Sequence, residues 1–185
     1  MLPFSKLSFW ERSIYTDGID FTIIGAGIVG MSTALHLRRA NPSAKIIILE
    51  RGYLPTGAST KNAGFTCFGS PTELRDDLSK MDERTVWNTV SMRMEGLREL
   101  FSLVDPANIL YEACGSWDII REDEEALKTD FLDYLNDKLF EISGEKMVYA
   151  EDRTKMTDLG FRGVKTAYYN RLEGAIHTGK LIEEL

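Results

Sequence analysis

The sequence predicts an α/β fold that begins with a parallel βαβ unit and continues into an α+β portion with antiparallel strands. Residues 21–24 are a short, β-rich apolar run that ends at a glycine. Residues 28–40 read as a helix, with Arg38 and Arg39 in the last turn, where positive charge suits the helix dipole. Residues 46–49 are a second continuous apolar run, which is typical of a parallel strand covered on both faces. Strand, helix and strand within about 30 residues make a βαβ unit.

The pattern becomes less regular after the second strand. Residues 51–69 are rich in glycine, serine, threonine and asparagine, and loops of that length inside a compact domain are usually functional. The next segment looks like the start of a helix, with Ser70 as the N-cap, Pro71 at the first helical position and Glu73 at the third. They predict the start of one long helix that ends before Asp105.

The C-terminal half predicts short strands mixed with helices. Apolar runs predict strands at residues 109–111, 117–120, 147–149 and 164–169. An acidic helix is predicted from about residue 122 to 142, followed by Gly144, and another helix from about Thr178. The acidic helix has an inner stripe made of Leu127, Phe131, Leu135 and Leu139. This irregular order favours an α+β arrangement over further βαβ units.

Composition limits the classes of function. The 185 residues are 43% hydrophobic, enough to fill a core, and a pI near 5.0 argues against a nucleic-acid scaffold. The apolar run near the N-terminus is far too short to cross a bilayer, and no signal peptide is visible. Cys67 and Cys114 are read as free thiols, while His36 and His177 are too few for a metal site. We therefore expect a cytoplasmic protein without a metal, a nucleic-acid partner or an integral membrane segment.

The motif that carries chemistry is G-x-G-x-x-G, placed between the first strand and the helix. It consists of Gly25, Ala26, Gly27, Ile28, Val29 and Gly30. The first glycine allows the tight turn, the second lets a pyrophosphate approach the backbone, and the third lets the helix pack on the strand. The helix N-terminus would hold the anion through its free N–H groups and dipole. The context predicts a dinucleotide site; the alternative is a plain glycine-rich turn.

Glu50 ends the second strand, twenty residues after Gly30. A carboxylate there can accept hydrogen bonds from a ribose diol and would repel a 2′-phosphate, which disfavours an NADP-type ligand. The next segment, residues 57–64, offers backbone N–H groups, two hydroxyls, an amide and a cation that could line an extended ligand. The alternative for this segment is a solvated surface loop.

Four pieces of the chain together resemble the family of FAD-dependent glycine and D-amino acid oxidases. They are residues 21–30, residues 46–51, residues 57–64 and residues 173–181. The last piece resembles the family's E-G-x-h-x-P-G-K-L segment, and it departs at Thr178, where the family commonly has proline. The resemblance covers nearly all of the chain and extends to related sarcosine, D-amino acid dehydrogenase and γ-glutamylputrescine oxidases.

The resemblance implies FAD as cofactor, with its ADP half on the glycine turn and Glu50 on the adenosine ribose. It places Arg51 near the adenine. It further implies that five residues lie along the pyrophosphate and towards the flavin: Ser59, Thr60, Asn62, Ala63 and Gly64. The implied chemistry is hydride transfer to the flavin from a carbon of an amine or amino acid that bears the nitrogen. No catalytic residue is assigned, because the family's substrate-binding side chains lie mostly beyond residue 185, and the oligomeric state stays open.

The resemblance also implies a division of the chain. Residues 1–19 would be an N-terminal arm, and residues 20–104 the first part of the FAD-binding domain. Residues 105–150 would be part of the substrate domain, and residues 151–185 a segment returning to the FAD-binding domain. The family's chains are considerably longer, so we expect the N-terminal portion of a flavoenzyme. The alternatives are a non-catalytic dinucleotide-binding fragment and an NAD-dependent dehydrogenase.

Overall fold

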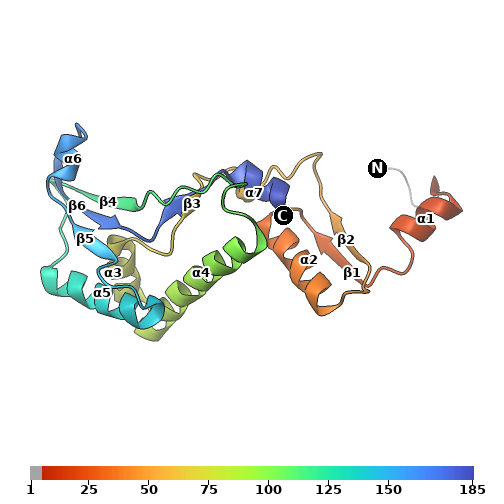
Figure 1. Ribbon diagram of the computed structural model, residues 1–185, viewed down its shortest axis with the longest axis horizontal. Coiled ribbons are helices and arrows are strands. Elements are labelled where there is room, and N and C mark those ends of the chain that lie inside the picture. Colours follow the sequence, from red (N-terminus) through yellow and green to blue (C-terminus); the bar gives the residue numbers. More distant parts are fainter. Residues whose placement is uncertain (1–5) are drawn as a thin grey trace. The chain divides into compact units, whose positions relative to one another are not determined.

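The computed structural model describes residues 6–185, and Figure 1 traces its helices and strands along the chain. The chain forms two compact units. The first takes in the chain up to Asn62 together with Ile182–Leu185, and the second is Ala63–Leu181. The predicted four-part division stays a prediction, and the first five residues of the predicted arm lie outside the described residues.

The first unit contains the predicted βαβ arrangement. Strand β1 (Phe21–Ile24) and strand β2 (Ile46–Leu49) are parallel, in a register that pairs Phe21 with Ile46, and helix α2 (Ile28–Ala40) connects them. The bounds agree with the prediction because glycine turns and Asn41-Pro42 delimit each element in the sequence itself. A short helix that the sequence analysis did not predict, α1 (Phe9–Tyr15), precedes them and has a capping box at its start.

The second unit contains antiparallel strands. Strands β4 (Ser116–Arg121), β6 (Val164–Asn170) and β5 (Tyr149–Glu151) form one sheet in the order β4-β6-β5. Trp117 on β4 pairs with Tyr169 on β6. A second, smaller ladder joins β3 (Phe65–Thr66) to β7 (Gly174–Ala175). Helix α6 (Lys155–Asp158) also belongs to this unit, and helix α7 (Thr178–Glu184) begins in it and ends in the first unit. The α/β class with an antiparallel α+β portion is therefore confirmed.

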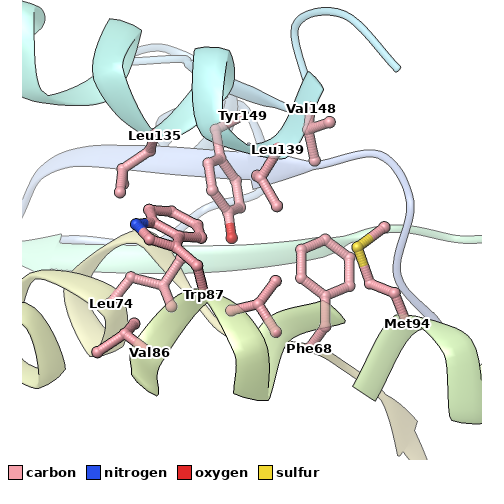
Figure 2. Close-up of a cluster of buried hydrophobic side chains, with 10 residues drawn as sticks. Phe68, Leu74, Val86, Trp87, Met94, Leu135, Leu139, Val148 and Tyr149 are labelled. Carbon is pink, nitrogen blue, oxygen red and sulfur yellow. The ribbon is translucent and has the colours of Figure 1, made fainter. Parts of the chain in front are cut away.

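Three helices of the second unit supply most of its hydrophobic core: α3 (Pro71–Lys80), α4 (Glu83–Leu103) and α5 (Thr129–Ser143). Leu135 and Leu139 reach the core from α5, while Trp87 and Met94 reach it from α4 (Figure 2). The Tyr149 hydroxyl lies inside this core and donates to the carbonyl oxygen of Gly69 at 2.6 Å. Burial raises the pKa of Tyr149 well above its ordinary value, so the phenol acts as a neutral donor.

The structure corrects the prediction of one long helix after Ser70. The chain breaks at Met81, whose backbone is extended, and the carboxylate of Asp82 accepts a hydrogen bond from the N–H of Thr85. Asp82 is thus the N-cap of a second helix, and capping residues favour a new helix start over continuation. The apolar spacing across the break is compatible with either arrangement, which is why periodicity alone missed it.

Three further predictions of secondary structure were wrong in extent. The acidic segment from residue 122 forms a turn, because Glu124 accepts a hydrogen bond from the N–H of Arg121, and α5 begins only at Thr129. No strand forms at residues 109–111: Ile109 and Leu110 lie in a turn, with Leu110 in a left-handed conformation, and Tyr111 has no regular structure. The strand predicted at residues 147–149 begins at Tyr149, since Met147 also has a positive φ.

Replacing a buried leucine should lower the free energy of unfolding more than replacing an exposed one. Leu139 is fully buried, so Leu139→Ala removes buried methyl groups and should lower the free energy of unfolding by about 2–5 kcal/mol. Leu159 is 55% exposed, so Leu159→Ala should cost less than about 1 kcal/mol. Urea unfolding followed by circular dichroism measures both. Equal losses in the two variants would contradict the core assignment.

Candidate dinucleotide site

The glycine turn connects β1 to the N-terminus of α2. Gly25 has φ +100°, a conformation that side-chain-bearing residues rarely adopt, and its N–H donates to the carbonyl oxygen of Leu49 at 2.7 Å. Gly27 is the N-cap of α2 and makes no side-chain cap of its own. A Cβ on Gly30 would collide with the carbonyl oxygen of Gly25, so the helix packs against the turn as the motif requires.

Ser59 lies directly against the N-terminus of α2. Its Oγ accepts a hydrogen bond from the N–H of Ile28 at 3.0 Å, and a Cβ placed on Gly27 would come within 2.9 Å of that oxygen. A serine hydroxyl that accepts one hydrogen bond still has its own proton to donate. Ser59 therefore takes up the N–H of Ile28 and presents its own hydroxyl proton beside the helix N-terminus in its place. The absence of a Cβ on Gly27 is what lets Ser59 approach so closely.

Glu50 is held against the same turn. Its Oε2 accepts from the N–H of Ala26 at 2.9 Å, and its Oε1 accepts from the N–H of Gly52 at 2.9 Å. These hydrogen bonds, the one from Ala26 first, lower the pKa of the Glu50 carboxyl. The carboxylate is therefore ionised at neutral pH, and each of its oxygens retains a lone pair that can accept from a hydroxyl.

Two other predicted residues stabilise the loop that carries Ser59. Residues Ala58–Thr60 form a single 3₁₀ turn. The Thr60 hydroxyl donates to the carbonyl oxygen of Pro55 at 2.8 Å, and the Asn62 amide donates to the carbonyl oxygen of Ala58 at 2.9 Å. These bonds explain why a glycine-rich segment holds a defined shape here; direct contact of Thr60 or Asn62 with a ligand stays a prediction.

The remaining predicted residues occupy different settings. Val29 is 76% exposed in the first turn of α2, and Arg51 is exposed just after β2. Ala63 and Gly64 belong to the second unit. Gly64 has φ +76°, and its carbonyl oxygen accepts from the N–H of Ile176 at 2.8 Å, next to the β3–β7 ladder. The first unit thus brings the glycine turn, Glu50 and Ser59 together. Gly64 is required by its own surroundings, because a Cβ there would collide with the carbonyl oxygen of Ile176.

Sequence reasoning missed one polar residue that organises the second unit. Glu173 is 3% exposed, and its Oε1 accepts from the N–H groups of Phe68 at 2.9 Å and Gly69 at 3.4 Å. Its Oε2 accepts from the Ser116 hydroxyl at 2.5 Å. The carboxylate therefore ties the loop after β3 to β4. The signal was present in the E-G pair that opens residues 173–181, but nothing in the sequence says that this glutamate is buried.

The part of the chain that the structure describes has no metal-binding cluster, and the Cys67 thiol is not activated. Within residues 6–185, no group of three or more His, Cys, Asp or Glu side chains is arranged to hold a metal ion. Partial desolvation of the Cys67 thiol by the surrounding chain, and then the charge of Glu173, raise its pKa, so it is protonated at neutral pH although the residue is exposed. No helix among these residues is both long enough and apolar enough to pass through a membrane.

Comparison with known families identifies the chain. Residues 20–185 match the model of the family described as DAO, FAD dependent oxidoreductase. The chain belongs to this family. FAD is accordingly the cofactor, and the first unit fits it: the N-terminus of α2 begins at a glycine turn that carries no bulky side chain, and the ionised Glu50 accepts from the N–H of Ala26 in that turn.

Two curated relatives are L-2-hydroxyglutarate dehydrogenases. The mitochondrial enzyme of Dictyostelium discoideum is 30% identical over 124 residues, which are 64% of this chain and 25% of the relative. The enzyme of Escherichia coli strain K12 is 31% identical over 110 residues, which are 57% of this chain and 23% of the relative. The chain thus spans about a quarter of the length of the curated relatives that it matches.

Two solved structures show the same fold at low sequence identity. Glycine oxidase from Bacillus cereus is 20% identical with a TM-score of 0.55, over 90% of this chain and 42% of that one. L-amino acid deaminase from Proteus vulgaris is 17% identical with a TM-score of 0.56, over 90% of this chain and 37% of that one. At these identities the likeness shows the fold alone.

Removal of the buried carboxylate should destabilise the second unit. Glu173→Ala leaves two buried N–H groups and the partly buried Ser116 hydroxyl without their acceptor, and should lower the free energy of unfolding by about 3 kcal/mol or more. Glu173→Gln keeps one carbonyl oxygen as acceptor and should cost less. Urea unfolding of both variants measures the difference. If glutamine and alanine destabilise equally, the hydrogen bonds to Phe68 and Ser116 do not carry the effect.

Proposed function

We propose that this chain holds the ADP half of FAD in an oxidoreductase that transfers a hydride from an amino acid or amine to the flavin. The observation that carries the proposal is the hydrogen bond from the N–H of Ala26 to Glu50 at the N-terminus of α2. It places an ionised carboxylate within one turn of a glycine-lined anion site. That combination matches a ligand with a ribose diol next to a pyrophosphate.

Each group has a defined task in this proposal. The N–H groups and dipole of α2 hold the pyrophosphate, and the Ser59 hydroxyl donates one more hydrogen bond to it. Glu50 accepts from the adenosine ribose, and Arg51 lies near the adenine. Thr60 and Asn62 keep the loop in shape, and Ala63 and Gly64 continue towards the flavin. Bound FAD would supply the redox chemistry, and the protein side chains would supply its position and its electrostatic surroundings.

The relatives and the family resemblance support a class of substrate. Two structural relatives are named for glycine and for L-amino acids, and two curated relatives for L-2-hydroxyglutarate. These compounds share a carboxylate next to the carbon that is oxidised. We take an amino acid or amine as the first candidate and a 2-hydroxy acid as the second, which the 30% identity to the curated relatives favours. The catalytic residues are unassigned, and the location that we propose is cytoplasmic.

The visible spectrum of the purified protein tests the cofactor and the reaction together. Flavin bands near about 370 and 450 nm that bleach on addition of an amino acid, without added nicotinamide, are the expected result. Bleaching by L-2-hydroxyglutarate alone would select the second substrate class. A colourless protein that binds ADP would favour the non-catalytic fragment, and reduction of added NAD would favour a nicotinamide dehydrogenase.

Substitution at the second glycine of the motif should remove flavin. Gly27→Val places a branched side chain against Ser59 Oγ and into the path of the pyrophosphate, so the purified variant should contain less than about a tenth of the wild-type flavin. Gly96 on α4 faces open space, so Gly96→Val is a matched control that should retain flavin. Flavin content per protein is read from absorbance. A Gly27→Val protein with full flavin would refute the turn assignment.

Substitution of the Glu50 carboxylate should weaken binding of the adenosine half of the cofactor. Glu50→Ala removes an ionised acceptor from the ribose and should weaken ADP binding about tenfold, as expected for a hydrogen bond to a charged group. Glu50→Gln retains one acceptor oxygen and should be intermediate. Calorimetric titration with ADP measures both, with circular dichroism as the control for folding. An unchanged affinity for ADP in Glu50→Ala would contradict the assignment of Glu50 to the ribose.

A further inference from the structure

The second unit contains a cavity beside α4 that plays no part in the proposed dinucleotide site. Its volume is about 310 Å³, at the lower end of the range for small-molecule sites. Most of its lining is apolar and comes from α4, from the loop after β3, from the loop between α4 and β4, and from the segment before β7. These apolar residues are Phe68, Met94, Leu97, Phe101, Tyr111 and Leu172. Such walls favour an apolar body of matching size.

One buried polar group lines this cavity without a partner. Phe65 and Cys67 are exposed, so the alternation of the strand turns the side chain of Thr66 to the opposite, buried side. The Thr66 hydroxyl is buried and has no hydrogen-bond partner among the described residues. Buried hydroxyls are nearly always satisfied in proteins, so a polar atom of a bound molecule would supply what the chain does not.

A cation without a partner lies at the edge of the same cavity. Arg98 is exposed, and within residues 6–185 it forms no ion pair or hydrogen bond. The acidic residue of the lining, Glu145, is already paired with Arg171 at 2.6 Å. The lining therefore has one uncompensated positive charge. A guanidinium group recognises a carboxylate through two parallel hydrogen bonds.

We propose that this cavity binds a small carboxylic acid with a compact apolar body, such as an aryl acetate. The carboxylate pairs with Arg98 and the ring lies against Phe68, Met94 and Leu97. A hydroxyl at the far end of the ring can pair with Thr66. At the roughly 30 Å³ that one water occupies in the liquid, the cavity takes on the order of ten non-hydrogen atoms, the size of phenylacetate.

The test is a calorimetric titration of the full chain with phenylacetate. We expect a dissociation constant in the millimolar range or tighter, the affinity open to a ligand of this size. Arg98→Gln should weaken binding at least about tenfold, the loss of a charge-assisted pair. Arg84 lies on the same helix but not on this cavity, so Arg84→Gln should leave the affinity within about twofold. Benzyl alcohol, a neutral molecule of similar size, should not respond to Arg98→Gln.

Two further variants keep the proposal falsifiable. Leu97→Trp fills the cavity from a partly exposed position and should abolish binding while circular dichroism stays unchanged. In the wild type, 4-hydroxyphenylacetate should bind more tightly than phenylacetate, and Thr66→Val should remove that gain. Absence of phenylacetate binding up to about 20 mM, or equal affinity in Arg98→Gln, would overturn the proposal. None of these residues belongs to the glycine turn, so flavin retention in the variants separates this outcome from failure of the proposed function.

Discussion

The close approach of the backbone at Gly30 to the turn at Gly25 is the constraint on which the candidate site depends. Any side chain at Gly30 would collide with the Gly25 carbonyl oxygen, so the distance between β1 and α2 is set by the absence of a Cβ. That distance places the N-terminus of α2 at the end of β1. It also brings the N–H of Ala26 within reach of Glu50, at the end of β2. The anion site and the carboxylate therefore follow from one backbone contact.

A buried carboxylate has the corresponding role in the second unit. Glu173 accepts hydrogen bonds from the loop after β3 and from Ser116 on β4, so three segments distant in sequence are joined through one side chain. A charged group of this kind needs good hydrogen-bond partners, because its burial without them is costly. The partners here are mostly backbone N–H groups, which no sequence pattern reveals.

Local signals account for the predictions that succeeded. The bounds of β1, α2 and β2 agree with the structure because apolar runs, glycines and Asn41-Pro42 delimit them within a few residues. Some predictions failed on local features that periodicity does not register, such as the N-cap at Asp82, and one failed on a partner far along the chain. The helix predicted from residue 122 begins at Thr129, since the N–H of Leu127 donates to the hydroxyl of Tyr168 at 2.8 Å. A hydrogen bond across 41 residues can override a local helical pattern.

The sequence by itself determined the βαβ unit, the glycine turn and the acidic residue that ends β2, because each depends on the size or charge of residues close together in the chain. Only the tertiary structure decided that Ser59 caps α2, that Glu173 is buried, and that Thr66 and Arg98 line one cavity. These are contacts between segments separated by tens of residues. Their formation depends on how the chain packs, and a pattern of neighbouring residues does not encode which distant groups will meet.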